Sequence, residues 1–182
     1  SETNELLQTH SYTTYPVNLL INGTKLTELT IPATVDTIPE YAFYNCNDLT
    51  KITIPSSVKH IGDKAFAGIT YSLITCQNPT PAAIGAEVVN GDQWFLVSDV
   101  NAYKSAWPNY ANNIVAVQDA EREVNVKALN NKSAIHVALG DIKVVNSVVD
   151  LKVNGTINSY DIMMLRNQMP NLRILDLSDA NI

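Results

Sequence analysis

Apolar residues in the N-terminal half of the chain recur in two consecutive segments of equal length, 26–48 and 49–71. Within each segment, apolar and polar positions first alternate, which is typical of a short strand with one buried face. A shift by one segment length superimposes the apolar positions as follows: Leu26 on Leu49, Leu29 on Ile52, Ile31 on Ile54, Val35 on Val58, Ile38 on Ile61 and Phe43 on Phe66. This fixed period predicts stacked repeats that bury their apolar faces against one another.

Each repeat has an internal plan that its turn residues define. Pro32 ends the first strand, because proline has no amide hydrogen to donate to a strand ladder. A second short extended piece follows in each repeat. The segments 40–43 and 63–66, which end in Ala-Phe, are then predicted to form a single helical turn that directs these two residues inward. Asn45 and Gly68 close the two units, since both residue types tolerate left-handed backbone.

The repeats are flanked by segments with other patterns. Residues 1–15 are polar and have no period, so we expect them to form a loose lead-in. Residues 16–25 predict a strand followed by a turn at Asn22-Gly23, which would open the stack at one end. A third strand is expected over 72–76. In it, Ile74 is equivalent to Ile52, although the distance between them along the chain is one residue shorter than the repeat.

The region 77–118 departs from the repeat and is expected to close the stack. It is predicted to contain a Pro-rich loop over 77–85, a strand over 93–97 and a helix over 100–107. Five aromatic residues gather in this region: Trp94, Phe95, Tyr103, Trp107 and Tyr110. Because a stack of repeats needs an atypical terminal unit and aromatic rings cover much area, we interpret them as an end cap. A platform on which sugars stack is the alternative interpretation.

A different pattern begins after residues 118–123, which are polar and charged and are expected to form a linker. A strand is predicted over 123–129, and the segment 132–146 favours helix. The segment 147–157 is predicted to be a strand that ends in a turn at Asn154-Gly155.

The last part of the chain alternates between strand and helix. The segment 158–169 predicts a helix with Ile162, Leu165 and Met169 on its buried face, and a final strand is expected within 171–182. One constant shift superimposes the following apolar positions: Val148 on Leu172, Leu151 on Leu175 and Val153 on Leu177. These patterns predict a second, incomplete repeat array of a different kind.

Composition narrows the possible classes of function. The 182 residues carry a net charge of −6. An acidic chain without a run of Lys and Arg lacks the basic face that nucleic acid requires, and it lacks a patch for anionic membranes. No stretch of 18 apolar residues occurs, so no membrane-spanning segment is predicted in this sequence. The polar start without a visible signal peptide fits either a cytosolic chain or the trimmed form of an exported protein.

The residues that usually carry chemistry are few and scattered. His10, His60 and His136 are not accompanied by a nucleophile elbow, and the zinc-hydrolase, P-loop and dinucleotide-binding motifs do not occur. We therefore expect no catalysis, no cofactor and no metal site. Cys46 and Cys76 occupy different positions in the repeat plan, and we interpret them as buried free thiols.

The repeat unit, which reads LxxIxIPxxVxxIGxxAFxxC, resembles the BspA-type leucine-rich repeat of bacterial surface proteins. The matching residues of the second repeat are Leu49, Ile52, Ile54, Pro55, Val58, Ile61, Gly62, Ala65 and Phe66. Cys46 matches the terminal Cys in the first repeat, whereas Ile69 departs from it in the second. The segments 75–85 and 100–114 look like the closing unit that often follows such repeats. The segment 172–182, LRILDLSDANI, is similar to the general signature LxxLDLSxxxI.

This resemblance implies a right-handed α/β leucine-rich-repeat solenoid, with short parallel strands on one face and turns and short helices on the other. We expect the first array and its cap over 1–119 and the second array over 120–182. The resemblance also implies export and display at the cell surface, in several members as an outer-membrane lipoprotein. It further implies adhesion to a host or microbial surface protein or glycan without catalysis. The alternative function is a structural spacer that holds another domain away from the cell envelope.

Outward strand positions supply the candidate binding residues. In parallel register, residues one repeat apart become neighbours about 4.8 Å apart. Two ladders are expected, one of Thr30, Thr53 and Thr75 and one of Glu28 and Lys51. They form either a ligand-facing strip or simply an exposed strand face, where threonine is common and a charge pair is solvated. Aromatic rings along an open strip would favour binding, and rings buried in a cap would favour a spacer.

Overall fold

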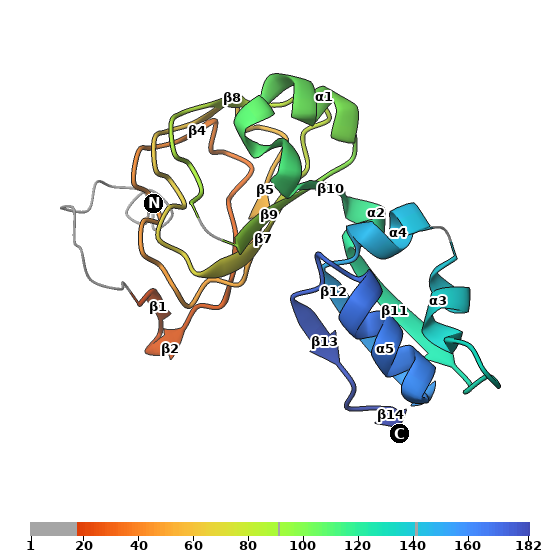
Figure 1. Cartoon of the computed structure of the whole chain (residues 1–182). Helices are drawn as coiled ribbons and strands as arrows, with labels where there is room; N and C mark the ends of the chain where they lie inside the picture. Colours follow the sequence, from red (N-terminus) through yellow and green to blue (C-terminus); the bar gives the residue numbers. More distant parts are fainter. Residues whose placement is uncertain (1–17, 91, 141) are drawn as a thin grey trace. The chain divides into compact units, whose positions relative to one another are not determined.

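The computed structural model describes residues 18–90, 92–140 and 142–182 (Figure 1). The chain divides into two compact units between Val115 and Ala116. Each unit has its own hydrophobic core. The lead-in predicted for residues 1–15 lies outside the described residues.

The first unit is built mainly from short strands. In chain order its elements are β1 (Leu20–Ile21), β2 (Thr24–Lys25), β3 (Glu28–Thr30), β4 (Thr37–Ile38), β5 (Lys51–Ile54), β6 (His60–Ile61), β7 (Tyr71–Cys76), β8 (Ala83–Ile84), β9 (Asp92–Val97), α1 (Val100–Ala106), the 3₁₀ helix η2 (Pro108–Asn113) and β10 (Ile114–Ala116). The predicted turn at Asn22-Gly23 is confirmed, because it joins β1 and β2 in an antiparallel hairpin.

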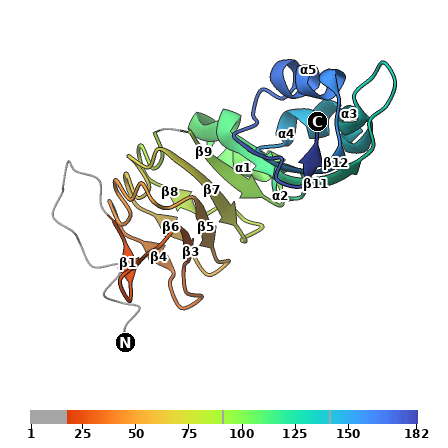
Figure 2. The ribbon, with the colours of Figure 1, turned by 90° about the horizontal axis from the view of Figure 1, so that it is seen from below.

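Successive repeats lie side by side in parallel register, as Figure 2 shows for β3, β5, β7 and β9. Leu29 on β3 pairs with Ile52 on β5, which in turn pairs with Ile74 on β7. The two spacings predicted from the sequence are therefore confirmed. The strands β4, β6 and β8 form a second parallel sheet. In it, Ile38 pairs with Ile61, and Ile61 pairs with Ile84.

The segments that contain Ala-Phe form turns, so the prediction of a helical turn is wrong. Tyr41 and Lys64 have φ angles of 57° and 54°, which lie in the left-handed region. The amide of Phe43 donates to the carbonyl of Ala65 in the next repeat at 2.8 Å, and the amide of Phe66 donates likewise to Val88 at 3.0 Å. Because these amides bond across repeats, they are not available for the hydrogen bonds of a helix.

A third repeat follows the two that the sequence shows. The predicted loop over 77–85 contains β8, which pairs with β6. Ile84 and Gly85 lie one repeat length after Ile61 and Gly62, but Val88-Val89 replaces Ala-Phe and hides the repeat. A Cβ at Gly62 would lie 2.4 Å from the Glu40 nitrogen of the preceding repeat. Glycine at this position therefore permits the close approach of successive repeats.

Aromatic side chains after the third repeat satisfy its backbone groups. The Tyr103 hydroxyl donates to the Asn78 carbonyl at 2.7 Å, and the Trp107 indole nitrogen donates to the Ala82 carbonyl at 2.9 Å. The Tyr110 hydroxyl accepts from the Val88 amide at 2.9 Å. The Phe95 ring lies 5.0 Å from that of Trp107, centroid to centroid.

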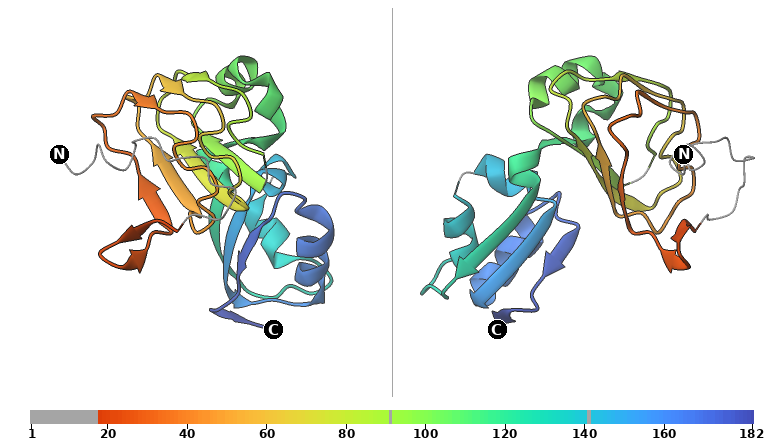
Figure 3. Two further views of the ribbon diagram at one scale, coloured as in Figure 1. Left: turned by 90° about the vertical axis from the view of Figure 1, so that its left-hand side faces the viewer. Right: turned by 180° about the vertical axis from the view of Figure 1, so that it is seen from behind.

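The second unit has a parallel sheet covered on one side by helices (Figure 3). Its elements are α2 (Val117–Ala120), β11 (Glu121–Val126), α3 (Ala134–Leu139), α4 (Ile142–Ser147), β12 (Asp150–Thr156), α5 (Ser159–Gln168), β13 (Ile174–Asp176) and β14 (Ala180–Asn181). Leu151 on β12 pairs with Leu175 on β13, so this part of the register predicted for the second array is confirmed. The strand β11 pairs with β12 at a longer spacing, for example Val124 with Val153.

The predictions of a linker and of a turn in this unit are wrong. The segment 118–123 is not a linker, because it forms most of α2 and the first half of β11, where Ala120 is fully buried. Asn154-Gly155 is not a turn either, since both residues lie inside β12. Cross-strand pairing of Asn154 with Asn125 and of Gly155 with Val126 keeps this dipeptide within the strand, although Gly155 has a φ angle of 98° in the left-handed region.

The buried face of α5 differs from the predicted one. Leu165 and Met169 are buried as expected, but Ile162 is 41% exposed. Asp161 is fully buried in its place, together with Met164. The Asp161 carboxylate accepts from the Ser133 hydroxyl at 2.7 Å and from backbone amides, and these bonds turn its side of the helix inward.

Candidate binding face on the parallel sheet

The five predicted binding residues lie on one face of the parallel sheet of the first unit. Thr30 pairs with Thr53, and Thr53 pairs with Thr75. Glu28 pairs with Lys51 in the adjacent ladder. We call this set of five residues the polar strip.

The alternation of the strands separates the polar strip from the core. Leu29, Ile52 and Ile74, which lie between strip positions along their strands, all pack in the core cluster. Glu28 and Thr30 are exposed, and the other three strip residues are partly exposed. The strip side chains are therefore available to a ligand along three neighbouring strands.

The outward positions become apolar on the following strands. Leu73 follows Lys51 in its ladder, and Trp94 follows Leu73 on β9. Leu96 follows Thr75 in the same way. The sequence interpretation that grouped Trp94 with Phe95 is therefore wrong, because neighbouring residues of a strand point to opposite faces.

Polar contacts between repeats hold the loops beside the strip. The Lys25 ammonium lies 3.1 Å from the Asp48 carboxylate. The Thr50 hydroxyl donates to the Thr27 carbonyl at 3.2 Å, and the Thr70 amide donates to the Asn47 side chain at 3.2 Å. These bonds each join equivalent positions one repeat apart, so they reinforce the register that aligns the strip.

The two cysteines are buried free thiols, as predicted. Burial, and to a smaller degree the nearby Asp48 carboxylate, raises the pKa of Cys46 to about 11. Burial raises the pKa of Cys76 to about 12 against the opposing effect of a hydrogen bond with Tyr103. Both thiols are therefore protonated near neutral pH, and a protonated thiol is a weak nucleophile and metal ligand.

The two histidines in the described part of the chain belong to different units. His60 is exposed on β6 in the first unit, and His136 is partly buried on α3 in the second. His10 lies outside the described residues. Within the described ranges, no group of three or more His, Cys, Asp or Glu side chains is placed to hold a metal ion.

A second polar face, which the sequence analysis did not single out, lies on the sheet of the second unit. The side-chain NH₂ group of Asn154 donates to the Glu123 carboxylate at 2.8 Å and to the side-chain oxygen of Asn125 at 3.1 Å. The Lys152 ammonium lies 3.0 Å from the carboxylate of Asp179 and 3.8 Å from that of Glu123. The signal in the sequence is the alternation of polar residues along 121–125 and 150–154, which a common register aligns.

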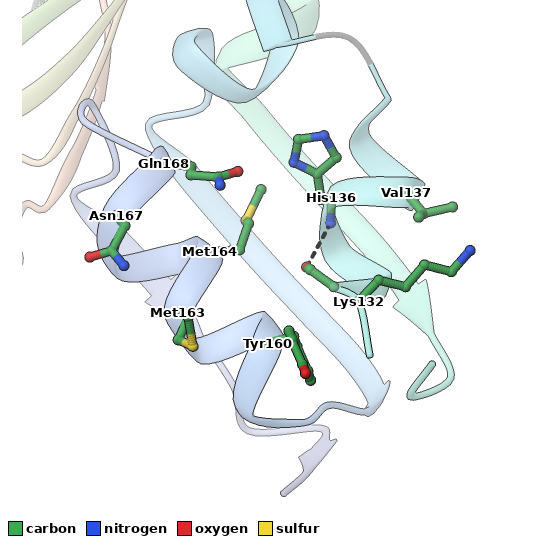
Figure 4. Close-up of a pocket in the computed structure, with 9 residues that line it drawn as sticks. Lys132, His136, Val137, Tyr160, Met163, Met164, Asn167 and Gln168 are labelled. Atoms are coloured by element: carbon green, nitrogen blue, oxygen red, sulfur yellow. Dashed lines mark hydrogen bonds between the residues drawn. The ribbon is translucent and has the colours of Figure 1, made fainter. Parts of the chain in front are cut away.

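A groove of about 360 Å³ lies between α3 and α5 in the second unit (Figure 4). Met164 forms its buried floor, and Tyr160, Met163 and Val137 stay more than 40% exposed around it. His136 also lines the groove, and its backbone amide donates to the Ser133 hydroxyl at 3.0 Å. Lys132, Asn167 and Gln168 also line the groove, but its exposed lining surface is mainly apolar, which suits contact with an apolar group.

No helix in the described part of the chain is long and apolar enough to cross a membrane. Residues 16–89 match the family model whose description reads “BspA type Leucine rich repeat region (6 copies)”. The match ends within the third repeat, whose β8 the structure pairs with β6 of the second. No curated protein matches the chain.

Proposed function

We propose, from the membership of residues 16–89 in the BspA-type leucine-rich repeat family, that this chain is a non-catalytic binding module. Its polar strip binds a protein or glycan on a host or microbial surface. The observation that supports this proposal is the register that aligns Glu28 with Lys51 and Thr30 with Thr53 and Thr75. Strands that are already fixed in one geometry lose little conformational entropy on binding, which favours such a face.

The proposal includes the architecture that the resemblance implies. The two parallel sheets of the first unit are faces of a leucine-rich-repeat solenoid, and Phe95, Tyr103, Trp107 and Tyr110 close it as an aromatic cap. The first array with its cap, predicted over 1–119, then corresponds to the unit that ends at Val115, and the second, incomplete array, predicted over 120–182, corresponds to the unit that begins at Ala116. The support is the parallel pairing in both units and the aromatic hydrogen bonds to the third repeat.

The proposal also includes a location outside the cytoplasm, at the cell surface or released from it. An outer-membrane lipoprotein is the more specific form of this proposal. The proposed location and the lipoprotein form both rest on the family match alone. Protease digestion of intact cells, followed by detection of the repeat region, tests display at the surface directly.

A substitution in the centre of the polar strip should weaken binding. After a glycan array and an extracellular-matrix protein array identify a ligand, Thr53→Arg is expected to raise the Kd about tenfold or more, because a long cation then interrupts the middle strand of the strip. Ser56→Arg places the same side chain at an exposed position of the same repeat outside the strip. Equal affinities of the two variants in a titration would show that the strip is not the binding site.

The second candidate function is the structural spacer, and one observation favours it. The rings of Phe95, Tyr103 and Trp107 are almost fully buried, so they do not line an open strip. A spacer needs no ligand. A folded sample that shows no binding above background on either array would therefore support the spacer and contradict the binding module.

A further inference from the structure

The tripeptide Asn-Gly-Thr occurs twice in the chain, at 22–24 and at 154–156. Asn-Gly sequences can deamidate without an enzyme. The glycine backbone nitrogen, once it has lost its proton, attacks the Cγ atom of asparagine and forms a new C–N bond. The bond from Cγ to the side-chain nitrogen then breaks and ammonia leaves. Water finally opens the succinimide ring at either carbonyl, which yields aspartate or isoaspartate.

We propose that Asn22 is a site of spontaneous deamidation and that the fold protects Asn154 from the same reaction. Because both asparagines are followed by Gly-Thr, the local sequence gives them the same intrinsic tendency to react. The difference between them must then come from the structure.

The surroundings of Asn22 leave the reacting groups accessible. Asn22 and Gly23 are both exposed, and a Cβ built on Gly23 would meet no atom within 4 Å. The hairpin that carries them pairs Leu20 with Lys25 and Ile21 with Thr24 and forms a separate two-stranded sheet. One further backbone hydrogen bond, from Leu26 to Leu19 at 2.8 Å, closes its base. Such a short hairpin has little stability of its own, so it opens locally and lets the attacking geometry form.

The surroundings of Asn154 block both reacting groups. The Gly155 amide donates to the Asp179 carbonyl at 3.1 Å, so its nitrogen is engaged in a hydrogen bond. The Asn154 carboxamide is held by its hydrogen bonds to Glu123 and Asn125. A Cβ on Gly155 would lie 2.1 Å from the Val126 carbonyl oxygen, which shows how closely the next strand approaches. Attack at Asn154 therefore requires that β12 separates from its neighbours on both sides.

Deamidation of Asn22 would therefore alter the turn between β1 and β2 as the protein ages. Either product adds one negative charge to a chain whose net charge is already −6. Isoaspartate also inserts an extra backbone atom into the turn between β1 and β2. The second unit keeps its amide network over the same period.

Incubation of the folded chain in mildly alkaline buffer, followed by peptide mass spectrometry, tests the proposal. Asn22 is expected to convert at least about tenfold faster than Asn154, because only the hairpin opens readily. In concentrated urea the two rates should become equal, since the tripeptides are identical. Asn22→Gln serves as the control that assigns the product peak to this position. Equal rates in the folded chain, or faster conversion at Asn154, would overturn the proposal.

Discussion

Replacement of Phe66 by alanine is expected to lower the free energy of unfolding of the first unit by about 3–5 kcal/mol, the usual cost of removing a buried aromatic ring. Phe66 is fully buried in the core of this unit. Its ring stacks on Phe43 of the preceding repeat, with centroids 5.5 Å apart and ring planes 4° from parallel. The substitution therefore leaves a cavity between two repeats and removes an aromatic pair at the same time.

Tryptophan fluorescence during urea unfolding measures this effect selectively. The two tryptophans of the chain, Trp94 and Trp107, both belong to the first unit. Lys59→Ala is the matched control, because Lys59 is exposed in the same repeat. A loss below about 1 kcal/mol for Phe66→Ala would mean that the ring does not occupy a packed position between repeats.

Replacement of Asp161 by asparagine is expected to destabilise the second unit by about 2–3 kcal/mol, because hydrogen bonds to a buried carboxylate are lost. One carboxylate oxygen accepts from Ser133 and from the Ile135 amide, and the other accepts from the Asn158 amide at 2.9 Å. Asparagine keeps the size of the side chain but directs an NH₂ group at one of these donors. The change therefore acts on the bonds that join α5 to α3.

The same carboxylate predicts a dependence of stability on pH. Burial by itself would raise the pKa of Asp161, but the hydrogen bonds from Ile135, Ser133, Asn158 and Ala134 outweigh it and lower the pKa below its ordinary value of 3.8. A group whose pKa is lower in the folded state stabilises the fold above the unfolded pKa. This contribution should be complete above about pH 4, and it should be lost as the pH falls from there through the folded pKa.

Methyl NMR of labelled methionine reports on the second unit, since Met163, Met164 and Met169 all belong to it. Below about pH 4, the difference in stability between the native chain and Asp161→Asn should shrink. Asp179→Asn is the control, because its carboxylate is exposed. A difference that stays constant with pH, or an effect of Asp179→Asn as large as that of Asp161→Asn, would contradict the role of the buried carboxylate.

The repeat spacing was sufficient to predict which strands of the first unit are neighbours. The equivalence of Leu29 and Ile52 gave the correct register, because a fixed period leaves one way to bury every apolar face. Ile74 continues this register at a spacing one residue shorter. It also placed all five residues of the polar strip on one face. The period does not encode a ligand for that face, since outward positions do not determine the stacking.

The errors arose where a long-range contact overrides a local pattern. The turn at Tyr41 looked helical, but its left-handed backbone is set by hydrogen bonds to the next repeat. Ile162 looked like a core residue, but the capping bonds of Asp161 rotate the helix so that an acid is buried instead. The third repeat was hidden because valines replace its Ala-Phe signature, and only the Ile84-Gly85 pair retains the spacing.

The most direct test of the stacked register is disulfide formation between cysteines introduced into the polar strip. Adjacent strands lie about 4.8 Å apart, which suits a disulfide, whereas strands two positions apart are separated by about 9.6 Å. The native Cys46 and Cys76 are buried and should not interfere. Under mild oxidation, the double variant Thr30→Cys/Thr53→Cys is predicted to cross-link within one chain, and Thr30→Cys/Thr75→Cys is not. Failure of the first pair to cross-link, or equal cross-linking of both pairs, would contradict the register on which the proposed binding face depends.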